Sequence, residues 1–189
     1  MKYRKDLINY FIKKFNYTSY LEIGVNTPDK TFNHILCSIK EGVDPNGRTT
    51  HKMTSDKFFG SIPKDKKWDI IFVDGDHNKE QVKKDILNSL DHLNDNGVII
   101  CHDVNPHLKS LLQSSACGSA WEAFAELRAT REDLVMYSLN FDHLGFIHRG
   151  NQNVFDKEVI YSWEFLDNNR KELMNELTLD EFYKLYPIN

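Results

Sequence analysis

Residues 69–74 read Asp-Ile-Ile-Phe-Val-Asp and give the strongest strand signal in the chain. A continuous apolar run of this length is typical of a strand that is buried on both faces of a parallel sheet. A second run of the same kind follows at residues 97–101. Between the two runs, apolar side chains recur at helical spacing up to the Asn96–Gly97 turn: Val82, Ile86, Leu90 and Leu93. We therefore predict a strand, a helix and a strand, with 69–74 in the centre of the sheet.

Strand and helix signals alternate on both sides of this unit. Upstream, the pattern predicts a strand at 20–24, a helix at 27–39 that begins at Thr27, and short strands at 42–47 and 49–53. Downstream, it predicts a helix at 119–131 and two strands, 134–139 and 144–148, that pair as a hairpin at one sheet edge. This alternation is typical of parallel βαβ units. The predicted class is α/β: a Rossmann-like, open, mostly parallel sheet with helices on both faces.

Length and composition fit one domain. The chain has 189 residues, of which 40% are hydrophobic and 28% are charged, so it can bury a core of its own. It contains no internal repeat, low-complexity tract or linker-like segment. We predict a single domain over residues 1–189, with an N-terminal helix at 1–17, an α/β core at 18–150 and a helical tail at 151–189.

Charge and cysteine content exclude several classes of function. The net charge of −4 gives no cationic field for nucleic acid, and no apolar stretch approaches the roughly 20 residues that cross a bilayer. The three cysteines, Cys37, Cys101 and Cys117, are odd in number and lack the spacing of metal ligands. We expect neither a nucleic acid nor a membrane partner, and a cytoplasmic location.

Polar residues follow the predicted strands at the edge where ligands bind in parallel sheets. Gly24 lets the backbone turn sharply and lets a ligand approach closely. Asp44 lies about 20 residues further on, the separation at which an acid binds a ribose diol. The alternative is that Asp44 is only a turn residue. Because the loop after Gly24 has no second or third glycine, a dinucleotide is disfavoured and a nucleoside cofactor is favoured.

The segments that carry these residues resemble a known family. They are EIGVNT at 22–27, GVDPN at 42–46, THKMTSDKFF at 50–59 and the block from WDIIFVDGDH to HDVNP at 68–106. Together they are similar to the class I S-adenosylmethionine-dependent methyltransferases, and more narrowly to methyltransferase family 24. The resemblance covers roughly residues 18 to 150, and the block at 68–106 is its most specific part.

The resemblance implies a seven-stranded sheet with one antiparallel strand in the edge region, and S-adenosylmethionine as cofactor. It places Glu22 and Gly24 beside the methionine portion, Asp44 on the ribose, and the segment 54–56 near adenine. Asn26 stands where many members have the second glycine of the motif. The implied cofactor-binding set is Glu22, Gly24, Asn26, Asp44, Ser55, Asp56 and Asp74.

Methyl transfer mainly requires alignment of nucleophile, methyl carbon and sulfur, because the sulfonium is already activated. A hydroxyl acceptor must also lose a proton, and a histidine is the natural general base because imidazole titrates near neutrality. The predicted catalytic residues are His102, His77, Asp74 and Asp103. The choice of base between the two histidines stays open. Each histidine has the alternative of a purely structural contact at a helix start or strand end.

Some relatives hold Mg²⁺ with carboxylates at the ends of the fourth and fifth strands, and Asp74 and Asp103 occupy those positions here. The next residue, Val104, stands where metal-dependent relatives usually have Asn or Asp. Since magnesium prefers a shell of oxygen ligands, this substitution argues against a required Mg²⁺.

The predicted function is O-methylation of a small hydroxylated acceptor, a sugar or another metabolite, with N-methylation left open. One alternative is a metal-dependent hydrolase that uses Asp74, His77, His102 and Asp103. Another is a methyltransferase-like binding protein without catalysis, which a fold never excludes. The chain shows no inserted lid over a substrate site, and a second copy in a homo-oligomer could supply one.

Overall fold

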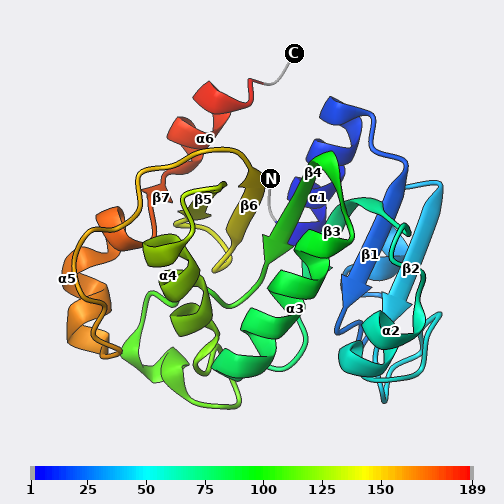
Figure 1. Ribbon diagram of the computed structural model, residues 1–189, viewed down its shortest axis with the longest axis horizontal. Coiled ribbons are helices and arrows are strands. Elements are labelled where there is room, and N and C mark those ends of the chain that lie inside the picture. The colour runs from blue at the N-terminus through cyan, green and yellow to red at the C-terminus, as the bar shows by residue number, and fades with distance from the viewer. Residues whose placement is uncertain (1–2, 188–189) are drawn as a thin grey trace. The chain divides into compact units, whose positions relative to one another are not determined.

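The computed structural model describes residues 3–187, so the outermost residues of the predicted terminal segments, 1–2 and 188–189, lie outside the described part (Figure 1). Contacts group the chain into two compact units. The first contains Met1–Asp76 and Gln81–Ile100, and the second contains His77–Glu80 and Cys101–Asn189. The single-domain organisation stays a prediction.

The first unit is built on parallel strands. Its strands are β1 (Ser19–Ile23), β2 (Ile39–Val43), β3 (Trp68–Val73) and β4 (Leu93–Cys101, up to Ile100 in this unit), and they pair in the order β2-β1-β3-β4. β1 runs parallel to both neighbours, with Tyr20 opposite Lys40 on β2 and opposite Ile70 on β3. Figure 1 shows these strands next to one another. The apolar run that predicted the central strand is fully buried, which confirms β3.

Three α-helices accompany these strands: α1 (Arg4–Phe15), α2 (Ser55–Ser61) and α3 (Lys79–Asp91). Each buries an apolar stripe, as Leu7 and Phe11 do on α1 and Phe58 does on α2. Helix α2 starts after Thr54, whose hydroxyl accepts a hydrogen bond from the Lys57 N–H. In the described part of the chain, no helix combines the length and the apolar character that a membrane crossing needs.

The second unit contains the predicted hairpin and the C-terminal helices. β5 (Leu134–Leu139) pairs with β6 (Gly145–Arg149) in antiparallel register, which confirms the hairpin, and pairs in parallel with β7 (Glu176–Leu177). The helices are α4 (Ala120–Thr130), α5 (Trp163–Leu173) and α6 (Leu179–Leu185). The short strand β7 has no counterpart in the sequence prediction. Over residues 3–187 the strands number seven, are mostly parallel and include an antiparallel one, so the predicted α/β class is confirmed.

The helix predicted at 27–39 is wrong. Residues 24–38 form an irregular crossover with a single 3-10 turn, η1 (Phe32–His34). The Lys40 ammonium donates to the carbonyls of Phe32 at 3.0 Å and Ile35 at 3.4 Å, groups that a helix would pair internally. The N-terminal helix also binds this segment, because the Asn9 amide donates to the His34 carbonyl at 2.8 Å. Ile39, which the prediction placed in the helix, begins β2.

Two other boundaries differ from the prediction. The strand predicted at 42–47 lies at 39–43, and the strand predicted at 49–53 is reduced to an isolated bridge between His51 and Val43. The helix predicted to end at Asn96–Gly97 ends at Asp91. The reason is that the His92 carbonyl accepts a hydrogen bond from the Trp68 N–H at 2.9 Å, which draws the chain into the sheet from Leu93 onward.

Asp69 on β3 ties together the starts of three strands. Its Oδ2 accepts from the main-chain N–H groups of Thr18 at 2.8 Å and Ser19 at 3.0 Å, and its Oδ1 accepts from the Asn94 amide at 2.7 Å. Burial raises the pKa of Asp69, but the hydrogen bonds from Thr18, Asn94 and Ser19 outweigh it and lower the pKa below its ordinary value. The carboxylate therefore stays ionised and fixes where β1, β3 and β4 begin.

We expect Asp69→Ala to lower the free energy of unfolding by about 1–3 kcal/mol, because it leaves main-chain donors near the sheet without their acceptor. Urea unfolding followed by circular dichroism measures this change. Asp65→Ala is the matched control, since Asp65 is exposed in the loop before β3. Equal midpoints for the two variants would show that Asp69 does not stabilise the strand starts.

Candidate active site

The predicted site residues divide between the two units. Those predicted to bind the cofactor lie in the first unit: Glu22, Gly24, Asn26, Asp44, Ser55, Asp56 and Asp74. The histidines and the remaining predicted acid lie in the second: His77, His102 and Asp103. In the first unit, contacts join Glu22 and Gly24 to Asp74 and join Asn26 to Asp44, whereas Ser55 and Asp56 contact α3. In the second unit, both histidines contact Asp103.

Gly24 is the point where the ends of three strands meet. Its φ is +88°, and a Cβ at this position would lie 2.1 Å from the Asp74 carbonyl oxygen and 2.6 Å from Gly75 Cα. Its N–H donates to the Val43 carbonyl at 2.8 Å, and the Asp74 N–H donates to the Ile23 carbonyl at 2.8 Å. Both the left-handed backbone and the close approach require glycine. The backbone after β1 therefore lies directly against the backbone after β3.

Asp44 organises the loop after β2 and the loop after β1. Its carboxylate is 8% exposed and accepts from three main-chain N–H groups: Asn26 at 2.7 Å, Asn46 at 2.7 Å and Gly47 at 2.5 Å. A carboxylate has about four lone-pair positions, so about one is left for a ligand hydroxyl. Asp44 thus has the turn role that the sequence left open, and retains room for the ligand role as well.

Asn26 adopts a left-handed backbone with φ +46°. Asparagine tolerates this conformation better than most other residues with a side chain. It therefore supplies at this position the backbone shape that glycine supplies in many members of the resembled family. Its N–H points at Asp44, as described above.

Glu22 is a buried carboxyl group, 2% exposed, at the end of β1. Its pKa is raised to about 8, mainly by burial and further by the nearby charge of Asp74. The hydrogen bond that Tyr20 Oη donates at 2.5 Å lowers the pKa but does not outweigh these two effects. The Arg4 guanidinium lies 3.5 Å from Asp74 Oδ2. At neutral pH, Glu22 is therefore mostly a neutral carboxylic acid beside an ionised Arg4–Asp74 pair.

Two residues that the sequence analysis missed extend this cluster. Gln81 Nε2 on α3 donates to Ser55 Oγ at 3.2 Å, Asp56 Oδ1 at 3.2 Å and Asp85 Oδ1 at 3.0 Å. Asp85 is 1% exposed, and burial raises its pKa to about 6, although Ser55 and Gln81 lower it. The available signal was an acid on the apolar stripe of the helix, four residues after Gln81. α3 thereby holds the start of α2, where Ser55 and Asp56 lie.

In the second unit, Asp103 collects three donors. Its Oδ2 lies 3.0 Å from His102 Nδ1 and 3.2 Å from His77 Nε2, and its Oδ1 accepts from Cys117 Sγ at 3.1 Å. Burial raises the pKa of Asp103, but His102, Cys117 and the charge of His77 outweigh it and lower the pKa below its ordinary value. Asp103 is therefore a buried carboxylate that stays ionised. Its own backbone is left-handed, with φ +61°.

His77 contacts an acceptor with each ring nitrogen. Nε2 faces Asp103, and Nδ1 faces the Ala116 carbonyl. A carbonyl and a carboxylate both accept hydrogen bonds, so each ring nitrogen of His77 faces an acceptor. The chain after Ala116 also closes on the His77 backbone, because the Ser119 N–H donates to its carbonyl at 3.0 Å. His77 is thus better suited to hold Asp103 than to accept a proton.

His102 is the better candidate for a base. The carboxylate of Asp103 at Nδ1 favours the tautomer that carries its proton there, which leaves the lone pair on Nε2. Asp142 Oδ1 lies 3.8 Å from Nε2, so a proton accepted at Nε2 would be held between two carboxylates. Of the two histidines that the sequence left open, the geometry favours His102.

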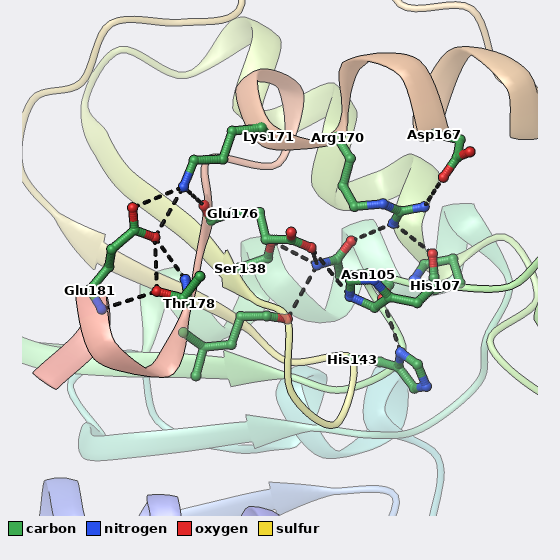
Figure 2. A network of polar contacts seen from close by, with 12 residues as sticks. Asn105, His107, Ser138, His143, Asp167, Arg170, Lys171, Glu176, Thr178 and Glu181 are labelled. Atoms are coloured by element: carbon green, nitrogen blue, oxygen red, sulfur yellow. Dashed lines mark hydrogen bonds and ion pairs between the residues drawn. The ribbon is translucent and has the colours of Figure 1, made fainter.

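A buried polar network holds the loop that follows Asp103 (Figure 2). Asn105 is fully buried and donates to Ser138 Oγ at 3.0 Å and Glu176 Oε1 at 2.8 Å. Arg170, 8% exposed on α5, donates to Asn105 Oδ1 at 2.7 Å and to the Pro106 carbonyl at 2.6 Å. β5, α5 and β7 therefore fix the segment that begins with His102 and Asp103. No local sequence pattern predicts these contacts.

The two carboxylates predicted as magnesium ligands do not present a shell that suits this ion. Asp74 is paired with Arg4 at 3.5 Å, and Asp103 is surrounded by two imidazoles and a thiol. Val104, the next residue, is fully buried. Magnesium prefers oxygen ligands and keeps several waters, which this donor set does not offer. We assign no step to a metal ion.

Comparison with known proteins gives the same fold. Residues 16–104 match the family model of a methyltransferase domain. The SAH-bound methyltransferase PaMTH1 of Podospora anserina is 15% identical, with 78% of each chain covered and a TM-score of 0.56. An O-methyltransferase of Bacillus cereus in complex with SAH is 14% identical, covering 76% of this chain and 78% of that one, with a TM-score of 0.57. The O-methyltransferase TomG of Streptomyces achromogenes in complex with SAM is 12% identical, covering 78% and 80%, with a TM-score of 0.55.

At these identities the likeness is one of fold. No curated protein matches the chain in sequence.

The raised pKa of Glu22 predicts how stability depends on pH. Between the ordinary pKa of 4.5 and the folded value of about 8, the folded chain holds a proton that the unfolded chain releases. The contribution of Glu22 is therefore full below pH 4.5 and is lost as the pH rises, by up to about 1.4 kcal/mol per pH unit. We expect Glu22→Gln to remove this loss. The free energy of unfolding of the variant, relative to that of wild type, should therefore rise by about 2 kcal/mol from pH 5 to pH 7.

Urea unfolding at pH 5, 6, 7 and 8 measures this difference. Glu158→Gln, at an exposed position, is the control and should follow wild type at each pH. Parallel curves for wild type and Glu22→Gln would mean that Glu22 is already ionised at pH 5.

Proposed function

We propose that this chain is an S-adenosylmethionine-dependent methyltransferase of class I and that it transfers the methyl group to an oxygen of a small hydroxylated acceptor. The observation that carries the proposal is the His102–Asp103 pair, held at 3.0 Å between a half-buried imidazole and a buried carboxylate. An alcohol needs a base to remove its proton, whereas a neutral amine already has a lone pair to attack with. A built base therefore favours oxygen as the methylated atom.

The cluster in the first unit fits the cofactor. Gly24 leaves its backbone bare where a side chain would clash, and Asp44 is positioned by three main-chain donors with about one lone pair to spare. The residues that would hold S-adenosylmethionine are Glu22, Gly24, Asn26, Asp44, Ser55, Asp56 and Asp74. When bound, the cofactor supplies an activated methyl group. The neutral carboxyl group of Glu22 can donate a hydrogen bond as well as accept one.

His102 would act as the general base. Its Nε2 accepts the proton of the acceptor hydroxyl while Nδ1–H stays bonded to Asp103. The imidazolium that forms is stabilised by the Asp103 carboxylate, whose lowered pKa keeps it ionised. Catalysis of this kind contributes about 10²–10⁴-fold to the rate. The second unit therefore supplies both the base that accepts the proton and the carboxylate that stabilises the resulting imidazolium.

His77 has a positioning role in this proposal. Placed between Asp103 Oδ2 and the Ala116 carbonyl, it orients the carboxylate and contributes to the lowered pKa of Asp103. The Cys117 thiol does the same from the other oxygen. The nitrogen and sulfur donors around Asp103 do not suit Mg²⁺. A hydrolase would also leave the close backbone approach at Gly24 and the positioned carboxylate of Asp44 without a role, which supports methyl transfer over metal-dependent hydrolysis.

We expect Asp44→Ala to weaken binding of S-adenosylhomocysteine at least tenfold, because both loops lose the acceptor that shapes them. Asn26→Gly should change the dissociation constant by less than about threefold, since glycine adopts the same left-handed backbone. Isothermal titration calorimetry measures both constants, with circular dichroism as the check of folding. Unchanged affinity in folded Asp44→Ala would exclude Asp44 from the cofactor site.

We expect His102→Ala to lower the rate of methyl transfer by about 10²–10⁴-fold and to leave the affinity for S-adenosylhomocysteine nearly unchanged. The assay follows the labelled methyl group of S-adenosylmethionine into a panel of sugars, nucleosides and phenols. His34→Ala, at an exposed position in the first unit, is the control and should keep the wild-type rate. Full activity in His102→Ala would remove His102 as the base. Absence of transfer by the wild type to every acceptor would favour the non-catalytic reading.

A further inference from the structure

A cleft lies in the first unit, between the crossover from β1 to β2 and the loop after β2. It has a volume of about 780 Å³ and is lined by residues of segments 26–33 and 46–50. It shares only Asn26 with the residues that we propose for the cofactor. The cleft exists because the crossover forms one 3-10 turn at Phe32–His34 in place of a full helix. The methyltransferase activity proposed above gives this cleft no task.

The lining is polar but carries little net charge. Asn33 and Asn46 are exposed and offer amide groups, which both donate and accept hydrogen bonds. Arg48 and Asp29 bring one charge of each sign. A strongly anionic or cationic ligand would meet its own sign on one side of the cleft. A neutral ligand that carries many donors and acceptors matches the lining on all sides.

An aromatic side chain gives the cleft an apolar surface. Phe32 is half-buried in the lining, and its ring centroid lies 6.4 Å from that of Tyr20 and 5.2 Å from the Lys40 ammonium. Sites for small molecules combine such apolar surfaces with a few oriented polar groups. Sugar rings have hydroxyl groups on their rim and C–H groups on their faces. They therefore have both of the surfaces that this lining can contact.

Two polar groups of the lining lack protein partners. The Thr49 hydroxyl is buried and makes no hydrogen bond within residues 3–187. Arg48 is exposed and forms no ion pair in the same part of the chain. Less than 1 Å² of Thr49 Oγ1 is accessible, so a ligand in the cleft does not reach this atom without a local shift. The Arg48 guanidinium is therefore a donor of the lining, unpaired within the described residues, that a ligand can contact.

We propose that this cleft binds a neutral carbohydrate, with Arg48, Asn46 and Asn33 contacting its hydroxyl groups and Phe32 contacting a ring face. The proposal goes beyond the methyl-transfer function and does not depend on it. A sugar bound here can be the acceptor, a part of a larger acceptor or a ligand that is never methylated.

Saturation-transfer NMR tests the proposal on the full chain with glucose, galactose, mannose and N-acetylglucosamine as probes. We expect transfer to at least one sugar, with millimolar affinity that falls at least tenfold in the double variant Asn46→Ala/Arg48→Ala. Lys64→Ala, in an exposed loop outside the cleft, should bind as wild type does. His102→Ala should also keep its sugar binding, which separates this result from failure of the proposed catalysis.

Three outcomes would overturn the proposal. One is the absence of transfer to all four sugars at about 10 mM, with circular dichroism showing a folded protein. Another is equal transfer in wild type and in the folded double variant, which would place the sugar elsewhere. The third is displacement of the sugar by millimolar inorganic phosphate at constant ionic strength, which would identify a site for anions.

Discussion

The contact between the backbone of Gly24 and the backbone of Asp74 is the constraint on which the first unit depends. A Cβ on Gly24 would lie 2.1 Å from the Asp74 carbonyl oxygen, so the loops after β1 and β3 can be this close only because no side chain intervenes. The same turn sends the chain toward Asp44, which collects main-chain donors from both flanking loops. Glu22 and Asp74 lie close enough for two negative charges to repel each other. Glu22 avoids this repulsion by holding a proton, and Asp74 forms an ion pair with Arg4.

The second unit buries one ionised carboxylate, that of Asp103, which is costly without compensating partners. Asp103 is 8% exposed, and a charge so placed is tolerated only with several donors around it. Two imidazoles and a thiol provide them. The two histidines differ in their contacts: His77 has a close acceptor at each ring nitrogen, whereas His102 has Asp103 3.0 Å from Nδ1 and Asp142 only at 3.8 Å from Nε2. A sequence shows that both histidines are present, but only the neighbours of each ring show which one can accept a proton.

Those parts of the fold that depend on local periodicity could be predicted, as the apolar run of β3, the stripe of α4 and the hairpin of β5 and β6 show. The sequence alone did not show that the helix expected after Thr27 is absent. Its carbonyl groups are bound by Lys40, which lies outside the segment, and local periodicity does not reveal such a contact. The same distinction between local pattern and distant contact applies to the site. The strand-end residues were visible as acids and glycines, whereas Gln81, Asp85 and Arg170 belong to it through contacts that spacing along the chain does not encode. The family resemblance supplied the cofactor class, and the geometry supplied the reasons why Asn26 can stand in place of glycine.

The network around Asn105 has a consequence for how the protein is made. Asn105 bonds to Glu176, 71 positions later, and to Arg170, 65 positions later. While the chain is emerging from the ribosome, the segment that carries the proposed base is synthesised long before its supports. Its buried amide finds Ser138 and the Leu139 carbonyl earlier, but Arg170 and Glu176 reach it only after α5 and β7 have been synthesised. The loop that carries the proposed base should therefore take its final shape late, and a nascent chain stopped short of α5 would order the proposed cofactor residues before it.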